Sequence, residues 1–193
     1  MKKFYAIIYL ACVLICFSSC SKETGKGYLT GNEYIDSYLE MPMGITKDEA
    51  IRILGEPSDI GDRGLTWEKD FEDNRYIILP ASFENNQLIT KSVNLYDLDA
   101  RGFPVKKSVS KSDVDKLKGK MELDKAGTGI ATYKNGISYE ETIEILGVEG
   151  LLTWDFKGSD EIHYTKYIWR LSNEDYTDLV ITYYDNALHS IES

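Results

Sequence analysis

Cysteine is scarce in this sequence, and its positions exclude disulfide chemistry from most of the chain. The three cysteines are Cys12, Cys16 and Cys20, so none follows residue 20. The rest of the chain therefore has no disulfide, no reactive thiol and no thiolate that could bind a metal.

Histidine and basic side chains are also few. The two histidines, His163 and His189, are not spaced with cysteine or glutamate as a zinc site requires, and no serine-elbow motif accompanies them. Both are predicted to be ordinary sheet residues. Lysine and arginine number 22 against 32 acidic residues, which gives a formal net charge of −10. This balance predicts no nucleic-acid partner and favours basic partners only weakly.

Motifs for metals and cofactors are lacking as well. Residues 97–102 match the opening of a calcium loop at its first, third and sixth positions, but Arg101 stands at a ligand position and Ser108 replaces the closing glutamate. A polar turn is therefore predicted there. The glycines are explained by turns and helix ends rather than by a phosphate cradle. The sequence predicts no catalytic residue, no metal and no cofactor.

The first twenty residues have the order of a secretory signal. Two lysines precede an apolar run at 4–17, and Ser18, Ser19 and Cys20 follow it. The run is short for a membrane span, so a signal peptide is predicted over residues 1–19. A plain signal peptide cut near Ser19, or an uncleaved anchor, is the alternative.

The stretch ending at Cys20 resembles the lipobox of bacterial lipoproteins. The resemblance implies that Cys20 becomes the first residue and carries the lipid, whose acyl chains (palmitate among them) hold the protein at a membrane. Ser21 follows in place of the aspartate that retains such proteins in the inner membrane, so the outer membrane is the expected location. Residues 20–40 are predicted to be the lipidated cysteine and a flexible, polar tether.

A near-duplication dominates the remaining sequence. The stretch GITKDEAIRILG at 44–55 and the stretch GISYEETIEILG at 136–147 are identical at seven of twelve positions. Thr46 and Ser138 each precede a glutamate by three residues, the pattern of a capping box, and Gly55 and Gly147 stand where a helix ends. Each stretch therefore predicts a short helix, and an isolated helix of this length needs a docking surface.

Strand-like segments follow each predicted helix. The tetrapeptide LTWE at 65–68 is echoed by LTWD at 152–155, and alternating segments at 75–83, 87–96, 163–171, 179–184 and 187–191 are separated by polar turns. On this echo, Trp154 and Leu146 are predicted to be core residues. One further short helix is predicted at 111–117.

This arrangement predicts an α+β fold of two tandem repeats, each a short N-terminal helix or helix pair packed on a sheet of three or four antiparallel strands. The predicted boundaries are 41–98 for the first repeat, 99–134 for a linker or insertion, and 135–193 for the second repeat. The two Gly-Ile-Ser/Thr helix starts and Leu-Gly helix ends resemble the β-lactamase-inhibitor-protein-like fold, related to the small lipoprotein of the outer-membrane β-barrel assembly machinery. The resemblance implies open sheet faces that dock another protein.

The predicted strand at 163–171 separates two kinds of side chain. Its odd-numbered face, with Tyr167, Trp169 and Leu171, is typical of a core covered by helices. Its even-numbered face mixes aromatic, aliphatic and basic groups, as protein interfaces do. The residues predicted to bind a partner are Tyr164, Lys166, Ile168, Arg170 and Tyr184. An ordinary solvated sheet face is the alternative for these residues.

The sequence therefore predicts a lipid-anchored envelope protein that binds another envelope or secreted protein, as a scaffold or an inhibitor, and catalyses no reaction. A hydrolase of envelope or extracellular glycans that uses paired carboxylates is the alternative, because such pairs leave no sequence motif.

Overall fold

The computed structural model describes residues 32–70, 76–93, 108–127, 129–158, 162–172 and 178–192. These residues form an α+β fold. The helices are α2 (Glu33–Glu40), α3 (Lys47–Leu54), α4 (Lys111–Lys118) and α5 (Tyr139–Leu146). The strands are β1 (Asp59–Ile60), β2 (Gly64–Asp70), β3 (Tyr76–Glu84), β4 (Gln87–Ser92), β5 (Glu122–Ala126), β6 (Ile130–Lys134), β7 (Leu151–Lys157), β8 (His163–Arg170), β9 (Asp178–Tyr184) and β10 (Ala187–Glu192).

All ten strands belong to one antiparallel sheet, whereas separate sheets of three or four strands were predicted. The strand order is β1-β2-β3-β4-β7-β8-β9-β10-β6-β5. The two parts of the sheet meet where β4 pairs with β7, through Thr90↔Phe156, Lys91↔Asp155 and Ser92↔Trp154. This short pairing, which we call the seam, makes the sheet continuous.

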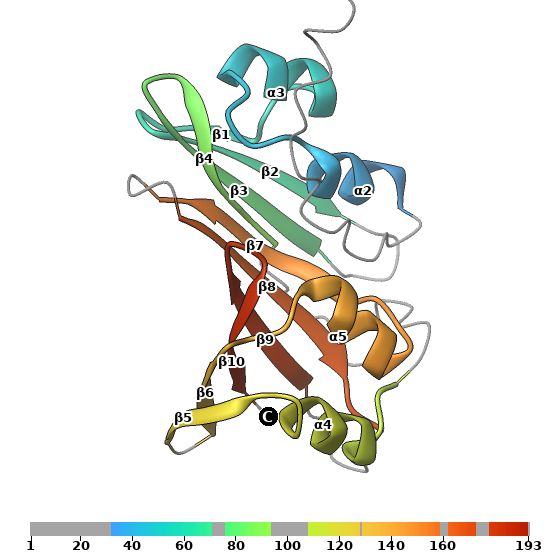
Figure 1. Ribbon diagram of the computed structural model, residues 1–193. Coiled ribbons are helices and arrows are strands. Elements are labelled where there is room, and N and C mark those ends of the chain that lie inside the picture. The colour runs from blue at the N-terminus through green and yellow to red at the C-terminus, as the bar shows by residue number, and fades with distance from the viewer. Residues whose placement is uncertain are drawn as a thin grey trace, which may run out of the picture.

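The helices cover one face of the sheet. Figure 1 shows α2 and α3 along the upper part of the sheet and α5 and α4 along the lower part. The side chains between the helices and the sheet form one buried cluster that runs through both parts. At its centre Tyr139 of α5 stacks on Tyr167 of β8, with ring centroids 4.1 Å apart. Burial of this apolar surface is the main source of stability.

The predicted ends of the duplicated helices are confirmed. Thr46 and Ser138 are the N-caps of α3 and α5, and both capping boxes are formed, with Glu49 and Glu141 closing them. Each box satisfies backbone N–H groups that a helix start leaves unpaired. The helix predicted at 111–117 is also present, as α4, and it buries Val114 and Leu117.

One predicted boundary, the end of the tether, is wrong. Residues 33–40, assigned to the tether, form α2 and bury Ile35, Tyr38 and Leu39, whose spacing places them on one helix face. The polar residues around them hid this pattern. Within the predicted linker or insertion, residues 111–134 supply α4 and the β5–β6 hairpin, and β6 pairs with β10 inside the sheet.

The echo of Leu-Thr-Trp does not mark equivalent positions. Trp67 lies in β2 and is fully buried against the helices. Trp154 lies in β7 on the opposite face of the sheet, where it is half-buried and stacks with Phe156. The structural counterpart of Trp67 is Trp169 in β8.

The pairing register and the indole contacts establish this correspondence. Trp67 pairs with Leu79 and Trp169 pairs with Leu179, each on the next strand of a meander. The indole N–H of Trp67 donates to the Gly55 carbonyl at 2.9 Å, and that of Trp169 donates to the Val148 carbonyl at 3.0 Å. Both carbonyls follow directly on a helix, so each tryptophan fixes a helix end to the sheet.

Two hairpins hold the starts of the duplicated helices. Both central residues of each turn, Asn85 and Asn86 in the first hairpin and Asp185 and Asn186 in the second, have positive φ, as a tight type I′ turn requires. The side-chain oxygen of Asn186 accepts a hydrogen bond from the backbone N–H of Tyr139, at 3.1 Å. Asn86 makes the same contact to Lys47 at 3.4 Å.

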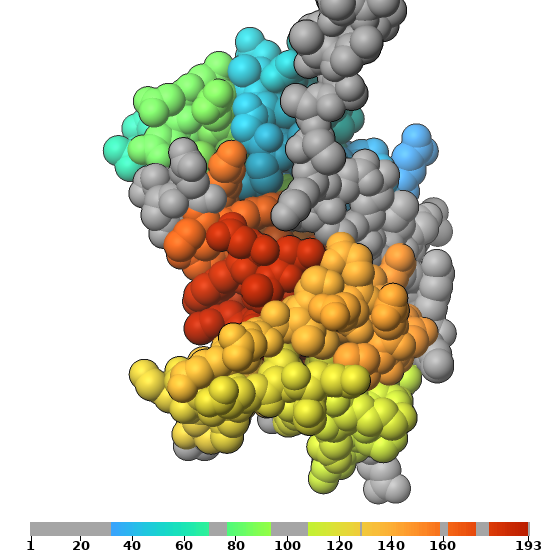
Figure 2. Space-filling model, viewed as in Figure 1, coloured from blue at the N-terminus to red at the C-terminus, as the bar shows by residue number. Residues whose placement is uncertain are grey.

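Backbone contacts reinforce these hairpin–helix joints. Leu88 donates its N–H to the Ile45 carbonyl, and Leu188 donates to the Ile137 carbonyl, both at 2.8 Å. Figure 2 shows the segment that enters α5 lying directly against the residues of β10. Gly136 sits at this joint, where an added Cβ would lie only 1.7 Å from the Leu188 carbonyl oxygen.

Burial predicts unequal effects for the tryptophans. Trp169→Ala should lower the free energy of unfolding by about 3 to 5 kcal/mol, and Leu146→Ala by about 2 to 5 kcal/mol, because both side chains are buried. Trp154→Ala should cost only about 1 kcal/mol, since its ring is half-buried on the other face. Urea denaturation measures all three variants, and a Trp154→Ala loss equal to that of Trp169→Ala would contradict the assignment.

The joint at Gly136 gives a second prediction. Gly136→Ala should destabilise the protein by about 3 kcal/mol or more, because the new methyl group must displace the backbone of β10. Gly44→Ala is the matched control at the first joint, where φ is +85° but no atom lies within 4 Å of an added Cβ. Its cost should be only the strain of positive φ, about 1 to 2 kcal/mol. Thermal unfolding distinguishes the two variants, and equal losses would refute the close approach.

Candidate functional site

The sheet face turned away from the helices, which we call the open face, carries the predicted binding residues. On β8, Thr165, Tyr167 and Trp169 are buried toward the helices. The side chains that alternate with them, from Tyr164 to Arg170, are half-buried on the open face. The predicted separation of the two faces of this strand is therefore confirmed.

Aromatic rings line up across the open face. We call this set the aromatic row; it consists of Trp154, Phe156, Tyr164, Tyr184 and His189. Phe156 lies directly opposite Tyr164, and Tyr164 lies directly opposite Tyr184, on three adjacent strands. The ring centroids of Tyr164 and Tyr184 are 4.6 Å apart, and His189 stacks on Tyr184 at 4.0 Å. The row thus runs across four strands, from β7 to β10.

The structure brings only two of the five predicted residues into this row. Tyr164 and Tyr184 are in contact, and Lys166 lies beside the row, directly opposite Trp154. Ile168 and Arg170 follow farther along β8, away from the row. Lys166, Ile168 and Arg170 lie opposite Thr182, Val180 and Asp178 of β9.

Sequence reasoning missed Trp154, Phe156 and His189. Trp154 and Phe156 are two residues apart in one strand, and that alternation could have placed them on a shared face. The echo of Leu-Thr-Trp had instead assigned Trp154 to the core. His189 lies in a β-bulge of β10, between Leu188 and Ser190, where simple alternation fails.

The charged side chains of the open face are paired with each other. Lys166 Nζ lies 3.7 Å from Glu192 Oε1, and Arg170 Nε lies 3.1 Å from Asp178 Oδ1. On β6, Lys134 lies within 4 Å of the carboxylates of Glu122 and Asp124. The first two pairs carry no net charge, whereas the group around Lys134 carries one net negative charge.

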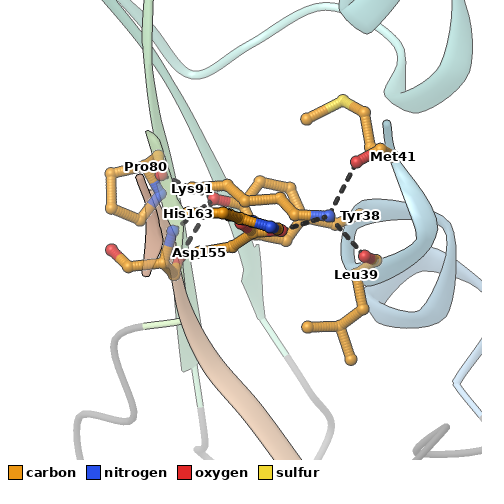
Figure 3. Close-up of polar contacts among 8 residues, drawn as sticks. Tyr38, Leu39, Met41, Pro80, Lys91, Asp155 and His163 are labelled. Carbon is orange, nitrogen blue, oxygen red and sulfur yellow. Dashed lines mark hydrogen bonds and ion pairs between the residues drawn. The ribbon is translucent and has the colours of Figure 1, made fainter. Parts of the chain in front are cut away.

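A buried polar cluster lies on the helix side of the seam (Figure 3). Lys91 and Asp155 are directly opposite each other in β4 and β7, and both are more than nine-tenths buried. Lys91 Nζ lies 3.7 Å from an Asp155 carboxylate oxygen. The other oxygen of Asp155 lies 2.5 Å from Nε2 of His163, the histidine predicted to be an ordinary sheet residue.

The cluster holds the end of α2 on the seam. Lys91 Nζ donates to the carbonyls of Leu39, at 2.5 Å, and Met41, at 2.6 Å, where the helix leaves carbonyl groups without partners. Burial lowers the pKa of Lys91, while the nearby Asp155 carboxylate opposes that shift. The buried ammonium group is thus surrounded by acceptors that offset its lost hydration.

Tyr38 of α2 adds a second attachment beside the seam. Its hydroxyl oxygen lies 2.5 Å from the Pro80 carbonyl oxygen and accepts a hydrogen bond from the Ser92 N–H at 2.9 Å. Burial raises the pKa of Tyr38 well above its ordinary value, so the hydroxyl keeps its proton. These contacts explain the cluster as a structural device that attaches α2 to strands β3 and β4.

Within the described ranges, no three histidine, cysteine or acidic side chains are grouped so that they could hold a metal ion. No helix in that part of the chain is long and apolar enough to cross a membrane. The candidate site that we draw from the ring contacts is the aromatic row and the side chains around it on the open face.

No protein-family model matches the chain, and no curated protein matches it in sequence.

The Lys91–Asp155 pair predicts a strong coupling between substitutions. Lys91→Met and Asp155→Leu should each lower the free energy of unfolding by about 3 to 5 kcal/mol, because each leaves a buried charge without its partner. The double variant should be much more stable than the sum of the two losses implies. A double-mutant cycle measured by urea denaturation checks this, and additive losses would show that the two charges do not interact.

Proposed function

We propose that this chain is a cell-envelope lipoprotein that binds another envelope or secreted protein through its open face and catalyses no reaction of its own. The observation that carries the proposal is the aromatic row. It lies on the sheet face opposite the helices α2 to α5, which none of these four helices covers.

The composition of the open face supports a protein partner. Tryptophan, tyrosine and arginine contribute most of the binding energy in protein interfaces, and apolar residues at the centre are surrounded by polar ones. The open face places charged and aromatic side chains side by side, since Lys166, which pairs with Glu192, lies directly opposite Trp154 of the aromatic row. The Arg170–Asp178 pair lies farther along β8 and β9. A rigid sheet also presents such side chains at little entropic cost on binding.

We also infer that the fold arose from a duplicated unit, with residues 32–93 and 108–192 as its two copies. The inference rests on the matched capping boxes, the matched tryptophans Trp67 and Trp169, and the matched hairpin contacts of Asn86 and Asn186. The β5–β6 hairpin, inserted between α4 and α5, is the chief addition in the second copy. The resemblance to the β-lactamase-inhibitor-protein-like fold agrees with this scheme and implies the same use of an open face.

The proposed anchor is a lipid on Cys20, which lies outside the described residues, and the proposed location is the outer membrane. The anchor would keep the protein at the envelope surface, where its partner would be another envelope protein or a secreted one. Mass spectrometry of the protein purified from membranes tests this point, since a Cys20→Ala variant should lose both the lipid and the membrane association.

Partner capture tests the proposed binding surface. The lipid-free protein, immobilised and exposed to envelope extract, should retain specific proteins that mass spectrometry identifies and that rebind in purified form. Phe156→Ala with Tyr184→Ala should weaken that binding by about 2 kcal/mol or more, roughly thirtyfold. Ile53→Ala is the matched control, because it removes an exposed apolar side chain from α3, away from the open face.

Two results would refute the proposed function. One is equal capture of the same proteins by the wild type and the Phe156→Ala/Tyr184→Ala variant, which would place binding elsewhere. The other is robust glycan hydrolysis by the purified protein that is lost on substitution of specific carboxylates, which would favour the hydrolase.

A further inference from the structure

We propose that the buried side chains of Lys91 and Asp155 condense to an isopeptide bond, which joins β4 to β7 covalently across the seam. The two residues are directly opposite each other on adjacent strands, and the carboxylate is held from its other side by His163. This inference concerns the helix side of the sheet and is independent of the proposed function of the open face.

The amine and the carboxylate are held together in a place that bulk water does not reach. Lys91 and Asp155 are 4% and 6% exposed, and Lys91 Nζ lies 3.7 Å from Asp155 Oδ2. Two groups that a fold fixes next to each other react as if they were at a very high concentration. Burial also excludes the water that would favour hydrolysis of an amide.

The hydrogen bonds of Lys91 orient its nitrogen for attack on the carboxylate. Nζ donates to the carbonyl oxygens of Leu39 and Met41, at 2.5 and 2.6 Å. Figure 3 shows these two carbonyls on one side of Nζ and Asp155 on the other. An uncharged amine can serve both carbonyls with its two N–H groups, which leaves its lone pair on the side of Asp155. Burial lowers the pKa of Lys91 and so favours this nucleophilic form.

His163 activates the carboxylate. Its Nε2 lies 2.5 Å from Asp155 Oδ1, whereas Lys91 approaches the other oxygen, Oδ2. An Nε2–H group that donates to Oδ1 stabilises the negative charge that develops on this oxygen when the amine attacks. The two carboxylate oxygens thus have different roles, since Oδ1 becomes the amide oxygen and Oδ2 leaves.

The reaction is a condensation that releases water. Nζ of Lys91 forms a bond to Cγ of Asp155, and the bond between Cγ and Oδ2 breaks. Oδ2 leaves as water with two of the three ammonium protons, and the third proton stays on nitrogen as the amide N–H. One positive and one negative charge disappear together, so the step needs no oxidant, reductant or second substrate. The ion pair of the structure is the state that precedes this step.

A covalent bond at this position would reinforce the narrowest connection of the sheet. Three residue pairs join β4 to β7, and no cysteine follows residue 20, so a disulfide cannot provide the link. A bond between residues far apart in the chain stabilises a fold by restricting the unfolded chain, as a disulfide does. Condensation also removes two buried charges, whose lost hydration the ion pair must otherwise offset.

Mass spectrometry of the intact, denatured, lipid-free protein tests the inference. The wild-type chain should be lighter than its sequence predicts by one molecule of water, whereas Lys91→Met and Asp155→Leu should have the full masses of their sequences. Trypsin should not cleave the wild type after Lys91, and should yield a branched peptide that joins residues 76–101 to residues 135–157. The wild type alone gives the decisive mass, so the test does not depend on the folding of either variant.

The Lys166–Glu192 pair is the internal control. Its nitrogen and oxygen atoms are also 3.7 Å apart, but each side chain is 35% exposed. Hydrated groups of this kind stay charged and do not condense. The digest should therefore contain no branched peptide that joins Lys166 to Glu192.

Substitution of His163 tests its part in the reaction. His163→Ala should leave most chains unlinked, because no donor then holds Oδ1. His163→Gln should restore linkage, since the glutamine amide can donate to the same oxygen. Thermal unfolding shows that each variant is folded, and full linkage in folded His163→Ala would refute this role of His163.

Two results would overturn the isopeptide bond itself. One is a folded wild-type protein that has, and keeps on prolonged incubation, the full mass of its sequence, which would leave Lys91 and Asp155 as a permanent ion pair. The other is a loss of water that persists in both Lys91→Met and Asp155→Leu, which would place the modification elsewhere.

Discussion

The pairing of β4 with β7 is the constraint on which the rest of the structure depends. Three residue pairs join the two parts of the sheet. In the central pair, Lys91 with Asp155, both charged side chains are buried. Buried charges are tolerated only when their partners are fixed, so the register of this short contact is narrowly determined. A shift by one residue would place Lys91 on the open face and remove the support for the end of α2.

Much of the fold could be predicted from local patterns. Short stretches of sequence determine several features. These are the capping boxes at Thr46 and Ser138, the turns at Asn86 and Asn186, and the two faces of β8. The seam could not be predicted in this way, because Lys91 and Asp155 are far apart along the chain. Asp155 ends the LTWD echo, but that echo indicates no partner for it. The polar composition of residues 33–40 likewise concealed a helix whose apolar side is narrow.

The candidate site was predicted only in part, for a related physical reason. Alternation along a strand identifies which residues share a face, and Tyr164 and Tyr184 do lie on the open face, where the pairing of β8 with β9 brings them into contact. It does not show which strands are neighbours, so the contribution of Phe156 from β7 required the sheet order. The repeated tripeptide around Trp154 was misleading because similarity of sequence was taken as equivalence of position, whereas the buried counterpart of Trp67 is Trp169.

The position of β10 has a consequence for the order in which the molecule is assembled. Residues 187–192 lie in the interior of the sheet, between β9 and β6, although β6 comes more than fifty residues earlier in the chain. β6 therefore has no neighbour on this side until β10 has been synthesised. The close contact between Gly136 and Leu188 also requires β10 to be in place. Without β10, the facing edges of β9 and β6 have no partner in the sheet, and unpaired strand edges promote aggregation.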